Sequence, residues 1–192
     1  MSHLNIHGRI GFAAPAATIA LMSVSASAVW AHPGHAPGAG LLDGGLHPFL
    51  GWDHLAILFA VGWFAARRGG REWLAAPARF AMMMGLGTAL GLSGLALPGM
   101  GAATALALAG LVLLSFVRPR GMELASALLL AVTAFAHGQL HASAWEGHGH
   151  PLAFALGIAA ASGVATALFA LAIRRIPALA WVDRRMAERR VR

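Results

Sequence analysis

The chain has 192 residues, of which 58% are hydrophobic and only 11% are charged. Soluble domains carry about 25% charged residues, so this composition indicates a protein with a lipid-facing surface. Cysteine is absent, which excludes disulfides, thiolate metal sites and thiol catalysis. The net charge of +7 comes from arginine alone. Because the arginines lie between hydrophobic segments, membrane topology explains them better than a nucleic-acid partner does.

Residues 1–31 have the pattern of a cleavable secretory signal peptide. Arg9 supplies the positive charge, and residues 10–24 form an apolar stretch. Small residues then precede two cleavage positions, after Ala28 and after Ala31. An uncleaved first helix is the alternative, and in either case the residues that follow lie outside the cytoplasm.

Five hydrophobic segments follow, and we expect each to form a membrane-crossing helix. They cover residues 47–66, 77–97, 102–117, 122–141 and 151–173. The sequence therefore predicts an all-α membrane protein with a bundle of about five transmembrane helices within residues 47–173. An extracytoplasmic segment of residues 32–46 precedes the bundle. A basic tail, residues 174–192, follows it and is too short and too charged to cross the membrane.

The distribution of the arginines supports this topology. With the mature N-terminus outside, the loops after the first, third and fifth segments and the tail are cytoplasmic. They hold all of the 14 basic residues except Arg9 and Arg79, which lie at the cytoplasmic ends of the signal and of the second segment. Cytoplasmic loops are enriched in arginine and lysine. We therefore expect the C-terminus to be cytoplasmic.

Polar residues interrupt the first hydrophobic segment, HPFLGWDHLAILFAVGWFAA. His47 and His54 are seven residues apart, so in one continuous helix they would lie on nearly the same face, two turns apart. Asp53 would lie about 100° to the side of His54. An aspartate at the centre of a membrane helix costs roughly 2.5–3.5 kcal/mol. We interpret this group as a cation site, with a buried hydrogen-bonded pair as the alternative.

The fourth segment carries a second group of histidines in the string AFAHGQLHA. His137 and His141 are one helical turn apart, so both rings can reach one ion. They lie at the same outer depth as His47 and His54. Imidazole with carboxylate suits nickel, cobalt, zinc or copper. The sequence thus predicts metal-handling residues on the outer side, namely His47, Asp53, His54, His137, His141, His32 and His35.

A third polar group lies in the loop before the fifth segment, ASAWEGHGH. Here His148 and His150, together with Glu146, either collect ions at low affinity or form an ordinary solvated loop.

The histidine motifs resemble those of the HupE/UreJ family. The string HPFLGWDH fits its H-x5-DH motif, HGQLH fits the core of its second histidine motif, and HPGH is similar to its mature N-terminus. The resemblance runs from about residue 20 to residue 173. It implies a bacterial inner-membrane protein, associated with hydrogenase or urease maturation, that is regarded as a permease for divalent nickel or, next, cobalt. By the resemblance, metal handling falls to His47, Asp53, His54, His137 and His141.

The chain departs from the family pattern at two points. Ala142 and Ala144 stand where the second motif has glycine and glutamate, so the acid of that motif is missing. Family members usually have a sixth span, where we count five. Either a second copy of the chain or a partner protein would then complete the bundle. The other expected partners are the metal ion and membrane lipid.

The expected function is secondary transport of nickel or cobalt, without enzyme activity. The sequence has no Walker A motif, so it is not expected to hydrolyse ATP. One alternative is a membrane metal-binding accessory protein without transport of its own. Others are a His-ligated haem protein, which would need facing histidines at mid-membrane depth, and a metallo-hydrolase, which would need a spare general base.

Overall fold

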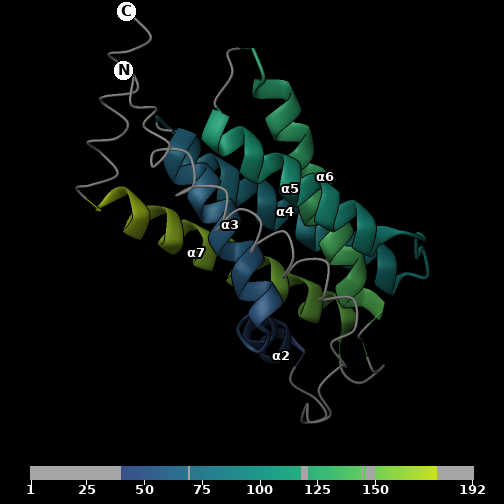
Figure 1. Ribbon diagram of the computed structural model, residues 1–192. Helices are drawn as coiled ribbons and strands as arrows, with labels where there is room; N and C mark the ends of the chain where they lie inside the picture. The colour runs from purple at the N-terminus through teal and green to yellow at the C-terminus, as the bar shows by residue number, and fades with distance from the viewer. Residues whose placement is uncertain (1–39, 69, 118–120, 144, 146–149, 177–192) are drawn as a thin grey trace, which may run out of the picture.

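The computed structural model describes residues 40–68, 70–117, 121–143, 145 and 150–176. The predicted signal peptide, His32, His35 and most of the basic tail lie outside the described residues, as do Glu146 and His148. All regular structure in the described ranges is helical (Figure 1), which confirms the predicted all-α class. The elements are α2 (Leu41–Leu46), the 3-10 helix η3 (His47–Phe49), α3 (Trp52–Arg68), α4 (Glu72–Leu92), α5 (Met100–Val117), α6 (Glu123–Ser143) and α7 (Pro151–Arg174).

The five long helices, α3 to α7, correspond in order to the five predicted hydrophobic segments. By length and composition, α6 and α7 can each cross a membrane, and the bent pair Leu41–Phe49 with Trp52–Arg68 gives a third candidate if it forms one span. Helix α5 is apolar but shorter, over Met100–Phe116. Helix α4 begins at Glu72, earlier than the predicted residue 77. The chain is therefore a membrane protein, and the number of five spans stays a prediction.

The first segment is not one continuous helix from His47, and this part of the prediction is wrong. The helices Leu41–Phe49 and Trp52–Arg68 meet at an angle of 81°. Pro48 lies in the first turn of η3, and the chain turns through Leu50 and Gly51 before α3 begins. His47 and His54 therefore lie on different elements. Their proximity comes from the bend and not from helical periodicity.

The short α2–η3 segment packs across α7 by backbone contact. A Cβ on Gly44 would lie 2.1 Å from the carbonyl oxygen of Phe154, and one on Gly157 would lie 2.2 Å from that of Leu41. Glycine is therefore required on both sides of this contact. The opposite side of the segment is apolar and exposed, through Leu41, Leu42, Leu46, Phe49 and Leu50. Such a face suits an interfacial position at the surface of a bilayer.

Helices α4 and α6 approach each other closely and run parallel. A Cβ on Gly87 would lie 2.2 Å from the carbonyl oxygen of Phe135, and one on Gly91 would lie 2.4 Å from the Cβ of Ala142. A Cβ on Gly138 would lie 2.3 Å from the carbonyl oxygen of Met84. Small residues at helix contacts are characteristic of membrane bundles, where close packing replaces the hydrophobic effect.

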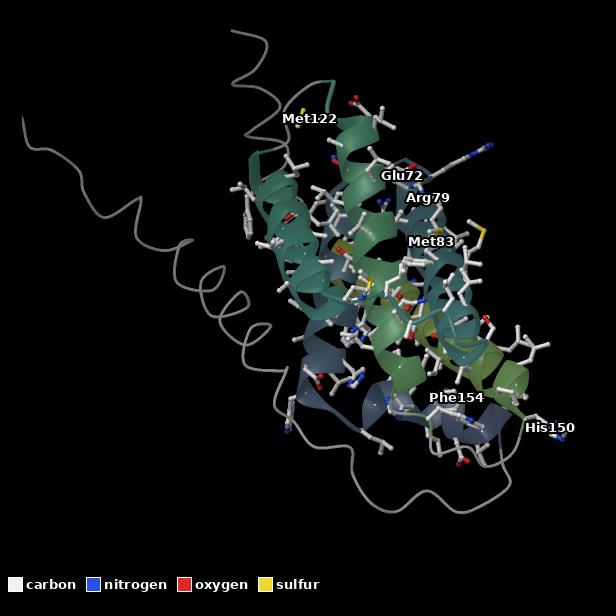
Figure 2. All side chains as sticks on the ribbon, turned by 90° about the vertical axis from the view of Figure 1, so that its right-hand side faces the viewer. Glu72, Arg79, Met83, Met122, His150 and Phe154 are labelled. Atoms are coloured by element: carbon white, nitrogen blue, oxygen red, sulfur yellow. The ribbon has the colours of Figure 1, made fainter. Side chains whose placement is uncertain are left out.

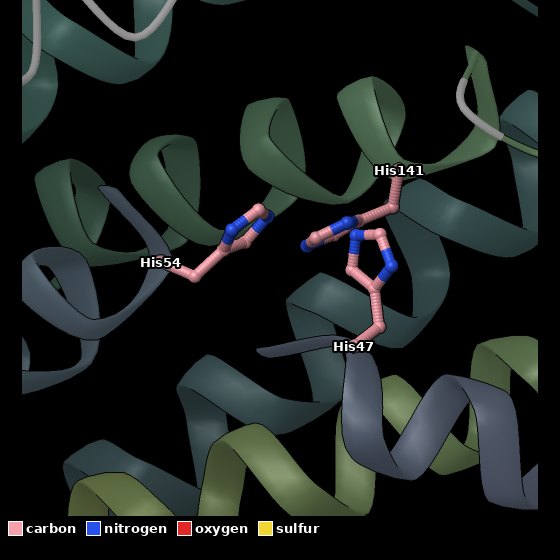
Figure 3. A group of neighbouring side chains, drawn as sticks. All are labelled: His47, His54 and His141. Atoms are coloured by element: carbon pink, nitrogen blue, oxygen red, sulfur yellow. The ribbon is translucent and has the colours of Figure 1, made fainter. Parts of the chain in front are cut away.

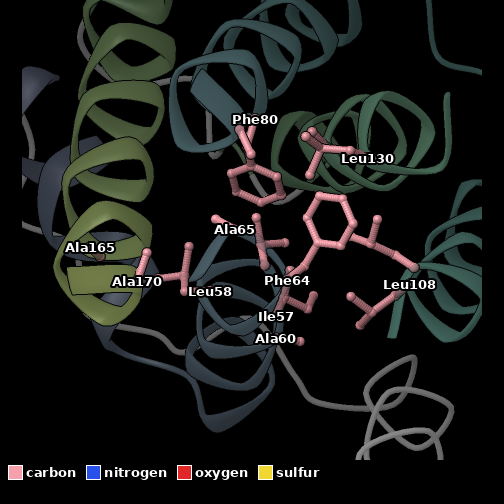
Figure 4. Packing of buried hydrophobic residues seen from close by; sticks show 14 of the residues in the cluster. Ile57, Leu58, Ala60, Phe64, Ala65, Phe80, Leu108, Leu130, Ala165 and Ala170 are labelled. Atoms are coloured by element: carbon pink, nitrogen blue, oxygen red, sulfur yellow. The ribbon is translucent and has the colours of Figure 1, made fainter. Parts of the chain in front are cut away.

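An apolar core fills the middle of the bundle. Phe64, Phe80, Leu108 and Leu130 come from four different helices and are all nearly fully buried. Figure 4 shows their side chains converging between α3, α4, α5 and α6. The core separates the two ends of the bundle, which differ in their polar groups.

One end of the bundle carries the described arginines. Arg67 Nε donates to the carbonyl oxygen of Ser115, at 3.4 Å, and Arg68 donates to Ser126 Oγ, so α3 is tied to α5 and α6. Arg79 pairs with Glu72 at the same end, whereas His150 lies at the opposite end (Figure 2). The four described histidines of the predicted site also lie toward the end opposite the arginines, because His54 lies in the first turn of α3 and Arg68 ends that helix.

The contact between α4 and α6 can be tested with a single methyl group. Gly87→Ala would place a Cβ against the backbone of α6, and overpacking of this kind costs roughly 1–3 kcal/mol. We expect a lower Tm for the purified full chain in detergent. Gly101→Ala in α5 is the control, because a Cβ there meets nothing within 4 Å. Equal Tm values for the two variants would contradict the close contact.

Candidate metal centre

Four histidine rings from three elements converge at one end of the bundle. His47 comes from η3, His54 from the first turn of α3, and His137 and His141 from successive turns of α6. Figure 3 shows His47, His54 and His141 pointing toward one another. The bend before α3 brings His47 to the ring of His54, with 5.1 Å between the centroids, and the ring of His47 also lies 4.8 Å from that of His141.

Three of these rings form a triangle of potential ligand atoms. One nitrogen each from His47, His54 and His141 lie within 4.8 Å of one another. An ion at the centre of such a triangle would be at most about 2.8 Å from each nitrogen, whereas imidazole binds zinc at about 2.0–2.1 Å. Each nitrogen would therefore move inward by less than about 1 Å to bind an ion, which side-chain rotation can supply. Three imidazoles are a suitable donor set for a borderline divalent metal.

The fourth histidine lies deeper in the bundle. The ring of His137 lies 4.6 Å from that of His141 and 5.1 Å from that of His54. His137 is only 5% exposed and His141 only 2% exposed. His137 Nδ1 and His141 Nε2 are both buried without a hydrogen-bond partner in the described part of the chain. A buried polar atom left unpaired costs about 1–3 kcal/mol, so these nitrogens favour a ligand that can pair with them.

Asp53 lies against His54 and outside the triangle. Its Oδ1 lies 3.1 Å from Nδ1 of His54, and both side chains are about four-fifths buried, at 20% and 17% exposure. A carboxylate next to a metal-binding imidazole fixes the orientation of the ring and raises its basicity. The geometry thus favours Asp53 as the group that orients His54.

Gly51 gives this pair the space that it needs, and sequence reasoning missed it. A Cβ at this position would lie 2.5 Å from Asp53 Oδ1 and 2.5 Å from His54 Nδ1. A glycine within the H-x5-DH string, directly before two polar side chains at a chain turn, is the signal that could have identified it.

Gln139 was also missed, although it lies between the two histidines of α6. Its Nε2 donates to the carbonyl oxygen of Gly87, at 3.1 Å, and its Oε1 accepts from the backbone N–H of Leu97, also at 3.1 Å. This side chain therefore ties the histidine-bearing turn to α4 and to the loop before α5. A polar residue between two histidines in an otherwise apolar segment was the signal that the sequence offered.

Aromatic side chains border the cluster toward α7. The ring of Phe154 lies 6.0 Å from that of His47 and 4.7 Å from that of Trp145. His150, by contrast, is exposed and is not in the histidine cluster. The structure therefore brings together five of the predicted site residues, His47, Asp53, His54, His137 and His141.

Gly51→Ala tests the arrangement of Asp53 and His54. The added methyl group would displace one or both side chains from the cluster. We expect a 10- to 100-fold weaker affinity for Ni²⁺, the usual range when a group that supports a ligand is lost. The measurement is calorimetric titration of the purified full chain. Gly45→Ala is the matched control on α2, because a Cβ there meets nothing within 4 Å. Equal affinity in both variants would show that Gly51 has no such role.

Comparison with known proteins shows which family the chain belongs to. The family profile described as HupE / UreJ protein matches residues 19–189. Protein HupE of Rhizobium leguminosarum bv. viciae is 31% identical over 125 residues, which are 65% of this chain and 63% of that relative's length. The chain thus matches less than two thirds of the curated relative. No solved structure matches. The profile covers most of the chain and includes both histidine strings, so this protein belongs to the HupE/UreJ family.

Proposed function

We propose that the protein takes up divalent nickel, or cobalt, across the bacterial inner membrane by secondary transport and so supports hydrogenase or urease maturation. One observation carries the proposal: four histidine rings from η3, α3 and α6 converge at one end of an apolar bundle, and the buried nitrogens His137 Nδ1 and His141 Nε2 have no described partner. Family membership agrees with it, because the family is associated with nickel and cobalt handling in hydrogenase and urease systems.

The donor set supports the choice of metal. Imidazole nitrogens favour borderline ions such as nickel, cobalt and zinc over the hard ions magnesium and calcium. The three-histidine triangle contains no carboxylate. Asp53, which contacts His54 on the side away from the triangle, balances part of the charge of the ion. The spacing of the rings does not suit haem, because a porphyrin would have to separate two axial imidazoles further than these contacts allow.

The charge distribution supports the direction of transport. The arginines at the far end of α3 and at the start of α4 belong on the cytoplasmic side by the positive-inside rule. The histidine cluster then faces the outer compartment, and an ion meets it on entry. At the charged end, hydrogen bonds of Arg67 and Arg68 tie α3 to α5 and α6. Because the sequence has no Walker A motif, we propose that an ion gradient or a partner drives uptake.

Uptake of Ni²⁺ and Co²⁺ by proteoliposomes containing the full chain tests this proposal. We expect His54→Ala to lower uptake by roughly tenfold or more, because it removes a ring from the triangle and the partner of Asp53. His150→Ala is the matched control, since it removes an exposed histidine at the same end but outside the cluster. Equal uptake by His54→Ala and the wild type would contradict the site, and no uptake by the wild type would contradict the function.

A further inference from the structure

We propose that the four histidines form two ion-binding stations in series, which share His54 and His141. The outer station adds His47 and the inner station adds His137. This inference rests on the proposed function. It adds a transfer of the ion between two positions within the cluster, which a single site would not have. An ion would move inward by exchanging one imidazole for another.

The ring positions describe two triangles with a common edge. The shared edge, His54 to His141, is 4.9 Å between centroids. His47 completes the outer triangle at 5.1 Å and 4.8 Å from these two rings. His137 completes the inner triangle at 5.1 Å and 4.6 Å. The centroid separations of the two triangles are nearly the same. Among the described residues, only the outer set already offers three nitrogens within 4.8 Å of one another, so the ring of His137 has to rotate further before the inner set can hold an ion.

The triangles differ in depth. His47 lies in η3, at the outer end of the bundle, and is only partly buried. His137 lies one turn inward from His141 along α6, which is about 6 Å at 1.5 Å per residue. It is 5% exposed, and its Nδ1 is buried without a described hydrogen-bond partner. A nearly fully buried imidazole nitrogen without a partner, next to two other imidazoles, indicates a second position for the ion.

The exchange step balances in bonds and charge. A nitrogen of His47 leaves the ion as a nitrogen of His137 binds it, and His54 and His141 stay bound throughout. All four ligands are neutral imidazoles, so the net charge of the site does not change. The ion therefore keeps at least two protein ligands during transfer. This lowers the cost of moving it away from water into the apolar bundle, where an unpaired charge is expensive.

Rapid mixing of Co²⁺ with the purified full chain, followed by visible absorption, tests the two stations. The wild type should show two phases, a fast one for the outer station and a slower one for transfer to the inner station. His137→Gln, which keeps a polar side chain of similar size, should retain the fast phase and lose the slow one. Its proteoliposome uptake should fall by tenfold or more. His47→Gln, in the short η3 helix, should lose the fast phase.

Thr133→Val is the matched control for the buried α6 variant. Thr133 is fully buried one turn inward from His137, and its hydroxyl donates to the carbonyl oxygen of Leu129, so valine keeps the volume and removes no metal ligand. This variant should retain both phases.

Two results would overturn the inference. One is identical single-phase kinetics for the wild type and His137→Gln. The other is a loss of all Co²⁺ binding in His137→Gln while Thr133→Val binds normally, which would indicate one four-histidine site. Two phases in a wild type that takes up no metal would instead refute transport and leave the two stations standing.

Discussion

Backbone-to-backbone contact at glycines is the constraint on which the rest of this structure depends. Inside a bilayer, helices gain little by burying apolar side chains against each other, so close packing must hold them together. Gly44 and Gly157 hold the α2–η3 segment against α7, and Gly87 and Gly138 hold α4 against α6. These two contacts fix the elements that carry His47 and His141. The histidines of the proposed metal site are thus positioned by glycines, which have no side chain.

The two ends of the bundle have opposite electrostatic character. At one end, Arg67 and Arg68 cross from α3 to the neighbouring helices and hold permanent positive charge there. At the other end lie the imidazoles and the carboxylate of Asp53, which lies against His54. The core between them is mostly apolar, with Phe64 and Leu130 nearly fully buried, and its few buried polar groups include the hydroxyl of Thr133. Under the proposed function, this asymmetry favours capture of the ion at the histidine end, and passage through the core would require the helices to move.

Much of this organisation could be predicted from the sequence, because it depends on local patterns. Hydrophobic length gave the long helices, and the one-turn spacing of His137 and His141 placed both rings on one face of α6. The 81° break before α3 could not be predicted in this way. It depends on how Gly44 meets Phe154, which lies over a hundred positions later in the chain. The seven-residue spacing of His47 and His54 correctly predicted that the two rings are neighbours, but it did so by assuming one continuous helix, which the structure does not have. The role of Gly51 becomes visible only once the bend is known.

The apolar outer face of the α2–η3 segment has a consequence for the surroundings of the protein. Its leucines and Phe49 are exposed on one side, while His47, at the junction of the two short helices, reaches the cluster on the other. In a bilayer, lipid in contact with this face would also contact the short segment that supplies one corner of the triangle. A change in bilayer thickness that shifted this segment would then also change the distance from His47 to His54. Bilayer composition would therefore affect the histidine cluster through this one short segment, without any contact between lipid and the histidines.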